Sequence, residues 1–446
     1  MYSRNLTYQP GRTARRSLLL LALCSAGASS AVAQTDPLQE WNRSLLKETN
    51  NILGFSFEQR TRWEDRHGVN FGRSVNQQDM LSRVRLGLQF KPYSWLKISA
   101  MAQDARVPFF GVPAPNTLRD TLDLQEANIQ LFPDRKNGFG ATFGRQMLGY
   151  GETRVIGGPQ WAPLARTFDA AHVYYQTANR RFEVLLISPV KIRTDSFNVP
   201  NLGERIWGTY NVFSKIFRGA SIDAYALRHS QNRIGGWLDA GTLGTNTVGG
   251  RFYGPLPARF SYSLEAIGQT GHIGALRQRA FAGSAAVSRK VSFFDRPMNL
   301  TLEYKVASGT RQGSTNSGTY DQLSPANHDK FGHIDLFGWR NLKTFRGIVV
   351  SEVTKRLTVN LMYTDARLYS ATDALYTIQG SVFSVSQGGT AGTHLGQEFD
   401  IYASYSRGAH TFGAGIGHFF KGEFVSQTTP NVTPRYLYVY QQYSFK

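Results

Sequence analysis

The amino-acid sequence predicts an all-β protein that crosses a membrane as a closed antiparallel β-barrel. Three features support this prediction: an export signal at the N-terminus, segments in which apolar and charged residues alternate, and long polar loops that alternate with short turns. A strand with lipid on one face and water on the other alternates with period two over about 9–11 residues. We therefore expect long extracellular loops and short periplasmic turns.

Residues 1–33 have the features of a cleaved secretory signal peptide. They begin with a positively charged stretch, continue with a short apolar run at 18–23 and end with small residues at 31–33. The apolar run is too short to span a bilayer as a helix. The only cysteine, Cys24, leaves with the signal, so we expect no disulfide or thiol chemistry in the mature chain. The expected route is Sec export, ending in the outer membrane of a Gram-negative-type bacterium.

Residues 34–51 are expected to form a short periplasmic lead-in, and residues 52–446 the barrel. Within the lead-in, the segment Pro37–Asn50 has its apolar residues roughly on one side of a helix. Those residues are Leu38, Trp41, Leu45 and Leu46.

The balance of charge is strongly basic. The sequence has 50 Lys and Arg against 31 Asp and Glu, and the signal holds four of the arginines, which leaves 46 against 31, a net charge of about +15. Such an excess indicates an anionic partner. The alternative is a basic surface that faces anionic lipopolysaccharide.

Alternating segments recur along the chain. In Leu53–Glu64, aromatic and aliphatic residues occupy one face, and Glu58, Arg60, Arg62 and Glu64 the other. The pattern returns at 82–91, 96–103, 300–306, 357–364 and 398–405. A soluble sandwich also alternates, but it rarely places charges of both signs on strand after strand. A closed barrel also satisfies the backbone in lipid.

Loops and the C-terminal end complete the pattern. Polar, glycine-rich or proline-rich stretches predict loops at 106–120, 190–203, 235–250, 308–328 and 384–397. Tyr436, Tyr438 and Tyr440 alternate, and Tyr443 and Phe445 continue after a phase slip at 441–442. An aromatic end is typical of barrels inserted by the outer-membrane assembly machinery, although Lys446 follows here.

Several strings resemble those of the bacterial alginate-export outer-membrane family, from about residue 52 to 446. The opening hairpin contributes residues 83–88, 91–92, 95–96 and 103–104. The central block contributes Gly144-Arg145-Gln146, Tyr150-Gly151-Glu152, Arg154-Val155-Ile156-Gly157, Trp161, Arg166 and Phe168-Asp169. Later matches lie at 327–332, at Asp335, at 338–339, at Asn341, at 396–400 and at 415–422. The resemblance implies a monomeric barrel of about 18 strands, with 16 possible. It also implies an arginine-lined pore for a polyuronate, occluded by loops or a periplasmic turn.

Arginines on polar strand faces are the candidate residues for an anion path. Guanidinium groups hold carboxylates in a bidentate fork, and rings of charged side chains set selectivity. The predicted path comprises Arg60, Arg62, Arg83, Arg85, Arg145, Arg154 and Arg166, of which the last three are the preferred constriction. The predicted counter-charges are Glu126, Asp169 and Glu398. The alternative interpretation is that these charges cross-link neighbouring strands as ion pairs and stiffen the barrel.

Other classes of function are disfavoured. The nine histidines show no metal-ligand spacing, and no nucleophile motif is present. We therefore expect no enzyme, no metal and no cofactor. The alternate glycines Gly413, Gly415 and Gly417 indicate a smooth strand face on which another element packs. No nucleic-acid recognition module is present.

The sequence thus favours an outer-membrane channel that passes an anionic polysaccharide or oligosaccharide, such as an alginate-like polyuronate. The alternatives are a general or small-organic-anion porin and a structural or adhesive envelope barrel. The expected partners are outer-membrane lipid and lipopolysaccharide, the anionic saccharide or organic anion, the assembly machinery and a periplasmic protein that feeds the pore.

Overall fold

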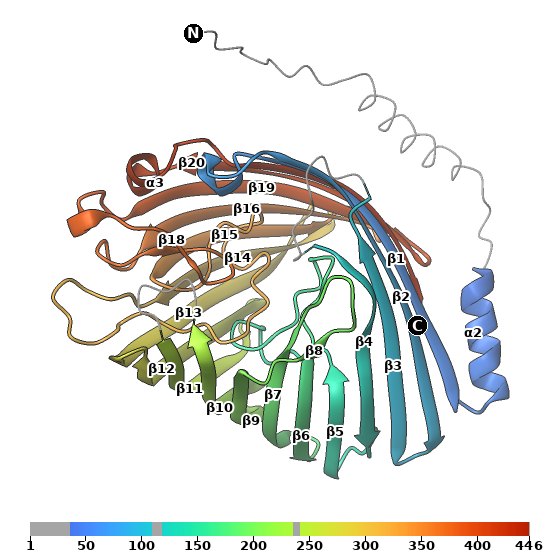
Figure 1. Ribbon diagram of the computed structural model, residues 1–446. Helices are drawn as coiled ribbons and strands as arrows, with labels where there is room; N and C mark the ends of the chain where they lie inside the picture. Colours follow the sequence, from blue (N-terminus) through green and yellow to red (C-terminus); the bar gives the residue numbers. More distant parts are fainter. Residues whose placement is uncertain (1–35, 109–117, 235–240, 446) are drawn as a thin grey trace.

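The protein is a closed antiparallel β-barrel, seen in a computed structural model that describes residues 36–108, 118–234 and 241–445 (Figure 1). The predicted signal peptide lies outside these residues. Eighteen long strands form the wall, and this confirms the predicted fold class and strand number. The wall strands are β1 (Leu53–His67), β2 (Gln77–Tyr93), β3 (Leu96–Arg106), β4 (Asp120–Leu131), β5 (Gly138–Gln146), β6 (Phe168–Gln176), β7 (Arg180–Lys191), β9 (Glu204–Phe217), β10 (Ala220–Ile234), β11 (Gly241–Leu256), β12 (Phe260–Ile273), β13 (Leu276–Phe293), β14 (Arg296–Ala307), β15 (Leu342–Glu352), β16 (Leu357–Leu368), β19 (His394–Arg407), β20 (His410–Lys421) and β21 (Arg435–Phe445).

Short elements lie in the connections between wall strands. The two-residue strand β8 (Val199–Pro200) pairs with the end of β7. The connection from β16 to β19 holds a small separate hairpin. The remaining short elements are η1 (Val69–Gly72), β17 (Leu375–Tyr376), β18 (Val382–Ser384), η2 (Gln387–Gly389) and α3 (Glu423–Thr428).

The barrel closes where the last strand pairs with the first. The register of β1 and β21 runs without a shift from Phe57 opposite Phe445 to His67 opposite Arg435. This pairing leaves no free sheet edge along the stretch. Strands in lipid need it, because their backbone N–H and C=O groups find no water to bond.

Apolar side chains on the outer face form the surface for lipid. On β2, Val84, Leu86 and Leu88 are exposed, whereas Arg83 and Arg85, which alternate with them, are buried on the inner face. The period-two prediction for this strand is therefore confirmed. The outer residues of β14 follow the same rule.

Helix α2 (Pro37–Glu48) precedes β1 and lies outside the ring of strands (Figure 1). Asp36 caps its first turn, and the Asn42 side chain donates to Phe55 O at 2.8 Å and accepts from Phe55 N at 2.9 Å. Phe55 lies two residues before the start of the pairing with β21. Asn42 therefore provides hydrogen-bond partners for the backbone of β1 at a position that β21 does not reach. No helix within the described ranges is long and apolar enough to span a membrane.

Other side chains pack on the alternate glycines of β20, as the sequence predicts: tyrosine rings on Gly413 and Gly415, and Asp400 and Ile334 on Gly417. A Cβ at Gly415 would lie 2.5 Å from Cε1 of Tyr438, and a Cβ at Gly413 would overlap Tyr440. The two pairs are directly opposite in the β20–β21 register. The missing side chains therefore make room for aromatic rings lying flat on the inner wall.

Replacing Gly415 with alanine (Gly415→Ala) is expected to lower the free energy of unfolding by about 1–3 kcal/mol, because the new methyl group overlaps Tyr438. The control is Gly268→Ala on β12, where a Cβ meets nothing within 4 Å. Urea unfolding followed by tryptophan fluorescence measures the difference. An equal loss in both variants would contradict the packing argument.

Two loop predictions need correction. The segment 241–250, predicted as part of a loop, is the first part of β11, and residues 394–397 begin β19. The loop prediction for β11 rested on its glycines, which are not turn residues here. A Cβ at Gly244 would overlap His272, and a Cβ at Gly249 would overlap Tyr225. These glycines accommodate neighbouring side chains, and the threonines between them, Thr245 and Thr247, are fully buried.

The predicted phase slip near the C-terminus is a change of face and not a break in pairing. β21 keeps one register with both neighbours. Tyr436 and Tyr438 are buried inside, whereas Tyr443 and Phe445 contact the outward-facing Phe57.

Candidate functional site

Two long loops cross the interior of the barrel: the β5–β6 loop (residues 147–167) and the β14–β15 loop (residues 308–341) (Figure 1). They pair with each other through Gly157 N to Ser324 O at 2.8 Å and Ser324 N to Val155 O at 3.0 Å. Ile156, Tyr320 and Trp339 are fully buried between them and the wall. The interior is therefore a packed core with the loops as part of it.

Four predicted arginines gather around one segment of the β5–β6 loop, Gln160–Ala162. Arg60 donates to the carbonyl oxygens of all three residues, at 3.1, 2.7 and 3.2 Å. Arg83 donates to the carbonyls of Gln160 and Ala162 at 3.1 and 3.0 Å. The other two contacts are Arg62 to Trp161 O at 2.7 Å and Arg85 to Gln160 Oε1 at 2.9 Å. We call these four residues the β1–β2 arginine cluster.

The cluster carries more positive than negative charge. Arg83 pairs with Glu58 at 2.5 Å, and Arg62 pairs with Glu64 at 2.6 Å. Four guanidinium groups thus meet two carboxylates, and the uncharged loop carbonyls fill the remaining acceptor positions. Carbonyl oxygens are weaker partners for guanidinium than carboxylates are.

Trp161 connects the cluster to the second loop. Arg62 lies over its ring at 3.9 Å, and His328 stacks on it at 4.7 Å with an interplanar angle of 4°. Tyr438 of β21 meets the ring edge-on at 4.8 Å. One side chain therefore holds both loops against β1 and β21.

The structure does not bring Arg145, Arg154 and Arg166 together as one constriction. Each has different partners: Arg145 pairs with Asp169 at 2.9 Å, and Arg166 donates to Pro325 O at 2.7 Å. Arg154 reaches the opposite wall, where it pairs with Glu265 of β12 at 3.2 Å and Glu303 of β14 at 2.9 Å.

The three predicted counter-charges also differ. Asp169 pairs with Arg145, but Glu126 accepts from Met147 N at 3.2 Å and Glu398 from Ile334 N at 2.8 Å. Glu126 and Glu398 thus hold loop backbone. The role of all these residues in an anion path stays a prediction.

The β14–β15 loop brings a fixed negative charge into the interior. Burial raises the pKa of Asp329, but the adjacent His333 and the guanidinium of Arg346 outweigh it and lower this pKa to about 2. Burial also lowers the pKa of His333 below its usual value. Asp329, which accepts from Tyr402 at 3.1 Å, therefore stays ionised across the physiological range.

Charged residues on β7, β10 and β11 were not among the site residues predicted from the sequence. Asp223 and Arg251 face each other in the β10–β11 register and pair at 2.9 Å. Arg181 and Glu183, two residues apart on β7, pair at 2.6 Å. For Asp223 and Arg251 the available signal was a pair of opposite charges at facing positions of consecutive strands, and it appears only once the register is known.

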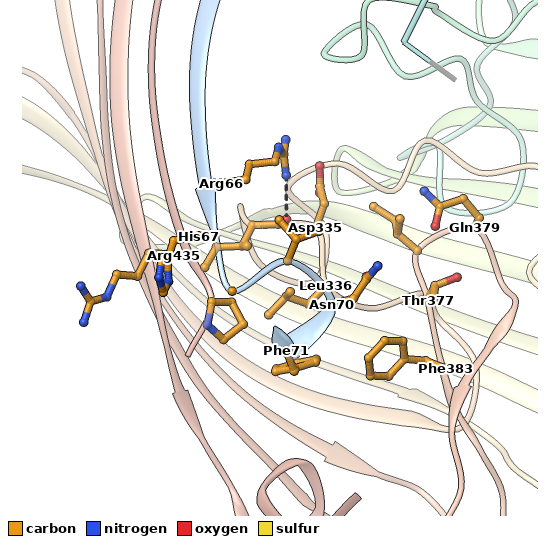
Figure 2. Close-up of a pocket in the computed structure, with 15 residues that line it drawn as sticks. Arg66, His67, Asn70, Phe71, Asp335, Leu336, Thr377, Gln379, Phe383 and Arg435 are labelled. Carbon is orange, nitrogen blue, oxygen red and sulfur yellow. Dashed lines mark hydrogen bonds between the residues drawn. The ribbon is translucent and has the colours of Figure 1, made fainter. Parts of the chain in front are cut away.

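A cavity of about 120 Å³ lies between the end of β1 and the surrounding loops (Figure 2). Arg66 donates to Ile334 O across it at 3.4 Å, and the rings of Phe71 and Phe383 lie 5.6 Å apart at one side. Ligand pockets usually measure about 300–1,000 Å³. This space is therefore a gap between loops and wall. No group of metal-ligating side chains occurs in the described part of the chain.

The family model for alginate export matches residues 50–439, which is most of the chain. The protein belongs to the alginate export family. As an outer-membrane barrel of this family, it has its long loops on the extracellular side and its short turns on the periplasmic side. The family is one of transport barrels and not of enzymes. A search of curated proteins finds no match.

Solved structures of outer-membrane channels share the fold of this alginate export family member. OpdQ of Pseudomonas aeruginosa superposes with a TM-score of 0.62 at 10% identity, covering 88% of this chain and 98% of that one. A BenF-like porin of Pseudomonas fluorescens Pf-5 gives 0.61 at 9%, with the same coverage. OpdK of P. aeruginosa with vanillate gives 0.58 at 9%, again covering 88% and 98%. At these identities the likeness concerns the fold alone.

Proposed function

We propose that the protein is a channel that passes anionic oligosaccharides of the polyuronate type, selected by arginines on the inner wall. The observation that carries this proposal is the β1–β2 arginine cluster, with four guanidinium groups against two carboxylates. Membership of the alginate export family supports the same cargo class.

The loop carbonyls in the cluster indicate how a cargo carboxylate binds. Arg60 already holds three carbonyl oxygens through both of its terminal nitrogens, and Arg83 holds two through one terminal nitrogen, at 2.7 to 3.2 Å. A carboxylate offers two oxygens with a full negative charge, so it adds ionic attraction to the hydrogen bonds and can bind a guanidinium group bidentately. A uronate unit thus replaces Gln160–Ala162 as the partner of the cluster when the segment moves aside.

A second candidate function is a pore for small organic anions. The observation that favours it is the dense interior, in which both loops pack against the wall around Ile156, Tyr320 and Trp339. A lumen filled in this way restricts the size of the cargo. OpdK, which shares the fold, was solved with the aromatic carboxylate vanillate.

Solute uptake into liposomes carrying the purified protein separates these functions. We expect trigalacturonate to enter several-fold faster than maltotriose, a neutral sugar of equal length, because the arginine cluster attracts carboxylates. Benzoate uptake without trigalacturonate uptake supports the second candidate. Faster entry of maltotriose than of both anions contradicts both functions.

A further inference from the structure

A second and larger cavity of about 470 Å³ lies under the start of the β5–β6 loop, against β6, β7, β9, β10 and β11. Its volume falls within the range of about 300–1,000 Å³ typical of ligand sites. Arg181 is the second residue of β7, and Arg251 and Tyr253 lie near the end of β11, all close to the short turns. The cavity is therefore on the periplasmic side of the loop.

The two arginines that line this cavity are matched by two carboxylates, one of which, Glu183, also contacts His172 at 3.0 Å. Arg251 pairs with Asp223, and Arg181 pairs with Glu183. Both carboxylate side chains are only 2% exposed, whereas Arg251 is 11% and Arg181 32% exposed. The buried acids thus neutralise guanidinium groups that still offer N–H donors to the cavity. The β1–β2 arginine cluster, by contrast, has more guanidinium groups than carboxylates.

Three tyrosines complete the lining, with their rings fixed by the same acids. Tyr210 donates to Asp223 at 2.8 Å and Tyr253 to its other oxygen at 3.3 Å, and Tyr150 donates to Glu183. The rings of Tyr150 and Tyr210 lie 4.8 Å apart. Rigid aromatic rings beside paired donors and acceptors are pre-organised, so a ligand orders little on binding.

We propose that this cavity is a binding site for an uncharged pyranose, in the periplasmic vestibule of the barrel. A pyranose presents apolar C–H faces, which pack on aromatic rings, and hydroxyl groups, which accept from guanidinium and donate to phenol oxygens. With its two guanidinium groups matched by two carboxylates, the site lacks the excess of arginine that attracts a carboxylate. The inference does not depend on the proposed anion path, because the two sites share no residue.

Calorimetric titration of the purified full-length protein with neutral trisaccharides tests the proposal. Maltotriose, cellotriose and mannotriose are titrated separately in a zwitterionic amine-oxide detergent, because glycoside detergents themselves carry a pyranose. At least one is expected to bind, and Tyr253→Leu and Arg181→Met to weaken binding about tenfold, a change of about 1.4 kcal/mol.

Matched controls come from the outward-facing neighbours on the same strands. Phe252, 39% exposed on the outer face, and Arg180, also exposed, are replaced in Phe252→Leu and Arg180→Met, which are expected to bind as the wild type does. No binding of any neutral trisaccharide, or equal weakening by the control variants, overturns the proposal. Tighter binding of trigalacturonate that is lost in Tyr253→Leu also overturns it. None of these results alters the uptake ratio that tests the proposed function.

Discussion

Replacing Arg60 and Arg83 together with glutamine (Arg60→Gln/Arg83→Gln) is expected to release the segment Gln160–Ala162 and raise single-channel conductance. The two arginines hold all three carbonyls of the segment. Hydrogen bonds from charged groups contribute about 1.5–3 kcal/mol each. The variant removes five such bonds, and a net loss of only about 3 kcal/mol, equal to two of them at the lower value, shifts the closed-to-open ratio of the segment by about 100-fold.

The same variant is expected to lose anion preference, because two of the four positive charges of the cluster are gone. Planar-bilayer recordings give both quantities, the conductance from current steps and the preference from the reversal potential. Arg106→Gln is the control, since Arg106 is exposed and pairs with Asp104 outside the cluster. Unchanged conductance and reversal potential in the double variant would refute the role of the cluster.

Arg154→Met is expected to destabilise the barrel by about 3–5 kcal/mol, because it leaves the buried carboxylate of Glu265 without its cation. Arg154 is 2% exposed and pairs with Glu152, Glu265 and Glu303. Glu303 keeps Lys305 and Arg346 as partners, whereas Glu265 keeps only the hydroxyl of Tyr225 among the described contacts.

The matched control is Arg367→Met, which removes an exposed ion pair with Asp365. Arg367 is 53% exposed, and such surface pairs contribute about 1 kcal/mol or less. Chemical unfolding of both variants in the same detergent gives the comparison. If Arg154→Met unfolds at the same denaturant concentration as Arg367→Met, the interior network does not anchor the β5–β6 loop.

Period-two alternation was sufficient to predict the barrel and the inner face of β1 and β2. Burial on one face and lipid on the other leave that pattern in the sequence itself. Glycines reduced its reliability at β11, where Gly244 and Gly249 provide space for His272 and Tyr225 and are not turn residues. The structural role of these glycines depends on side chains of neighbouring strands, which the sequence around each glycine does not show.

The candidate site was predicted in part for a related reason. Arg60, Arg62, Arg83 and Arg85 lie on adjacent, paired strands, so the hairpin alone brings them together. Arg154 and Arg166 lie in a loop whose path through the interior depends on contacts with Glu303 and Pro325, far away in the sequence. No periodicity encodes such a path. The pairing of Asp223 with Arg251 similarly becomes visible only with the strand register.

The β5–β6 loop meets the wall at the β1–β2 arginine cluster, which holds loop carbonyl oxygens beside only two carboxylates, and this contact is the basis of the proposed anion path. The reversal potential of the wild-type channel in a potassium chloride gradient tests it most directly. We expect a reversal potential between zero and the chloride equilibrium potential, and a shift toward zero in Arg60→Gln/Arg83→Gln. A wild-type reversal potential between zero and the potassium equilibrium potential means cation selectivity and would rule out the anion path.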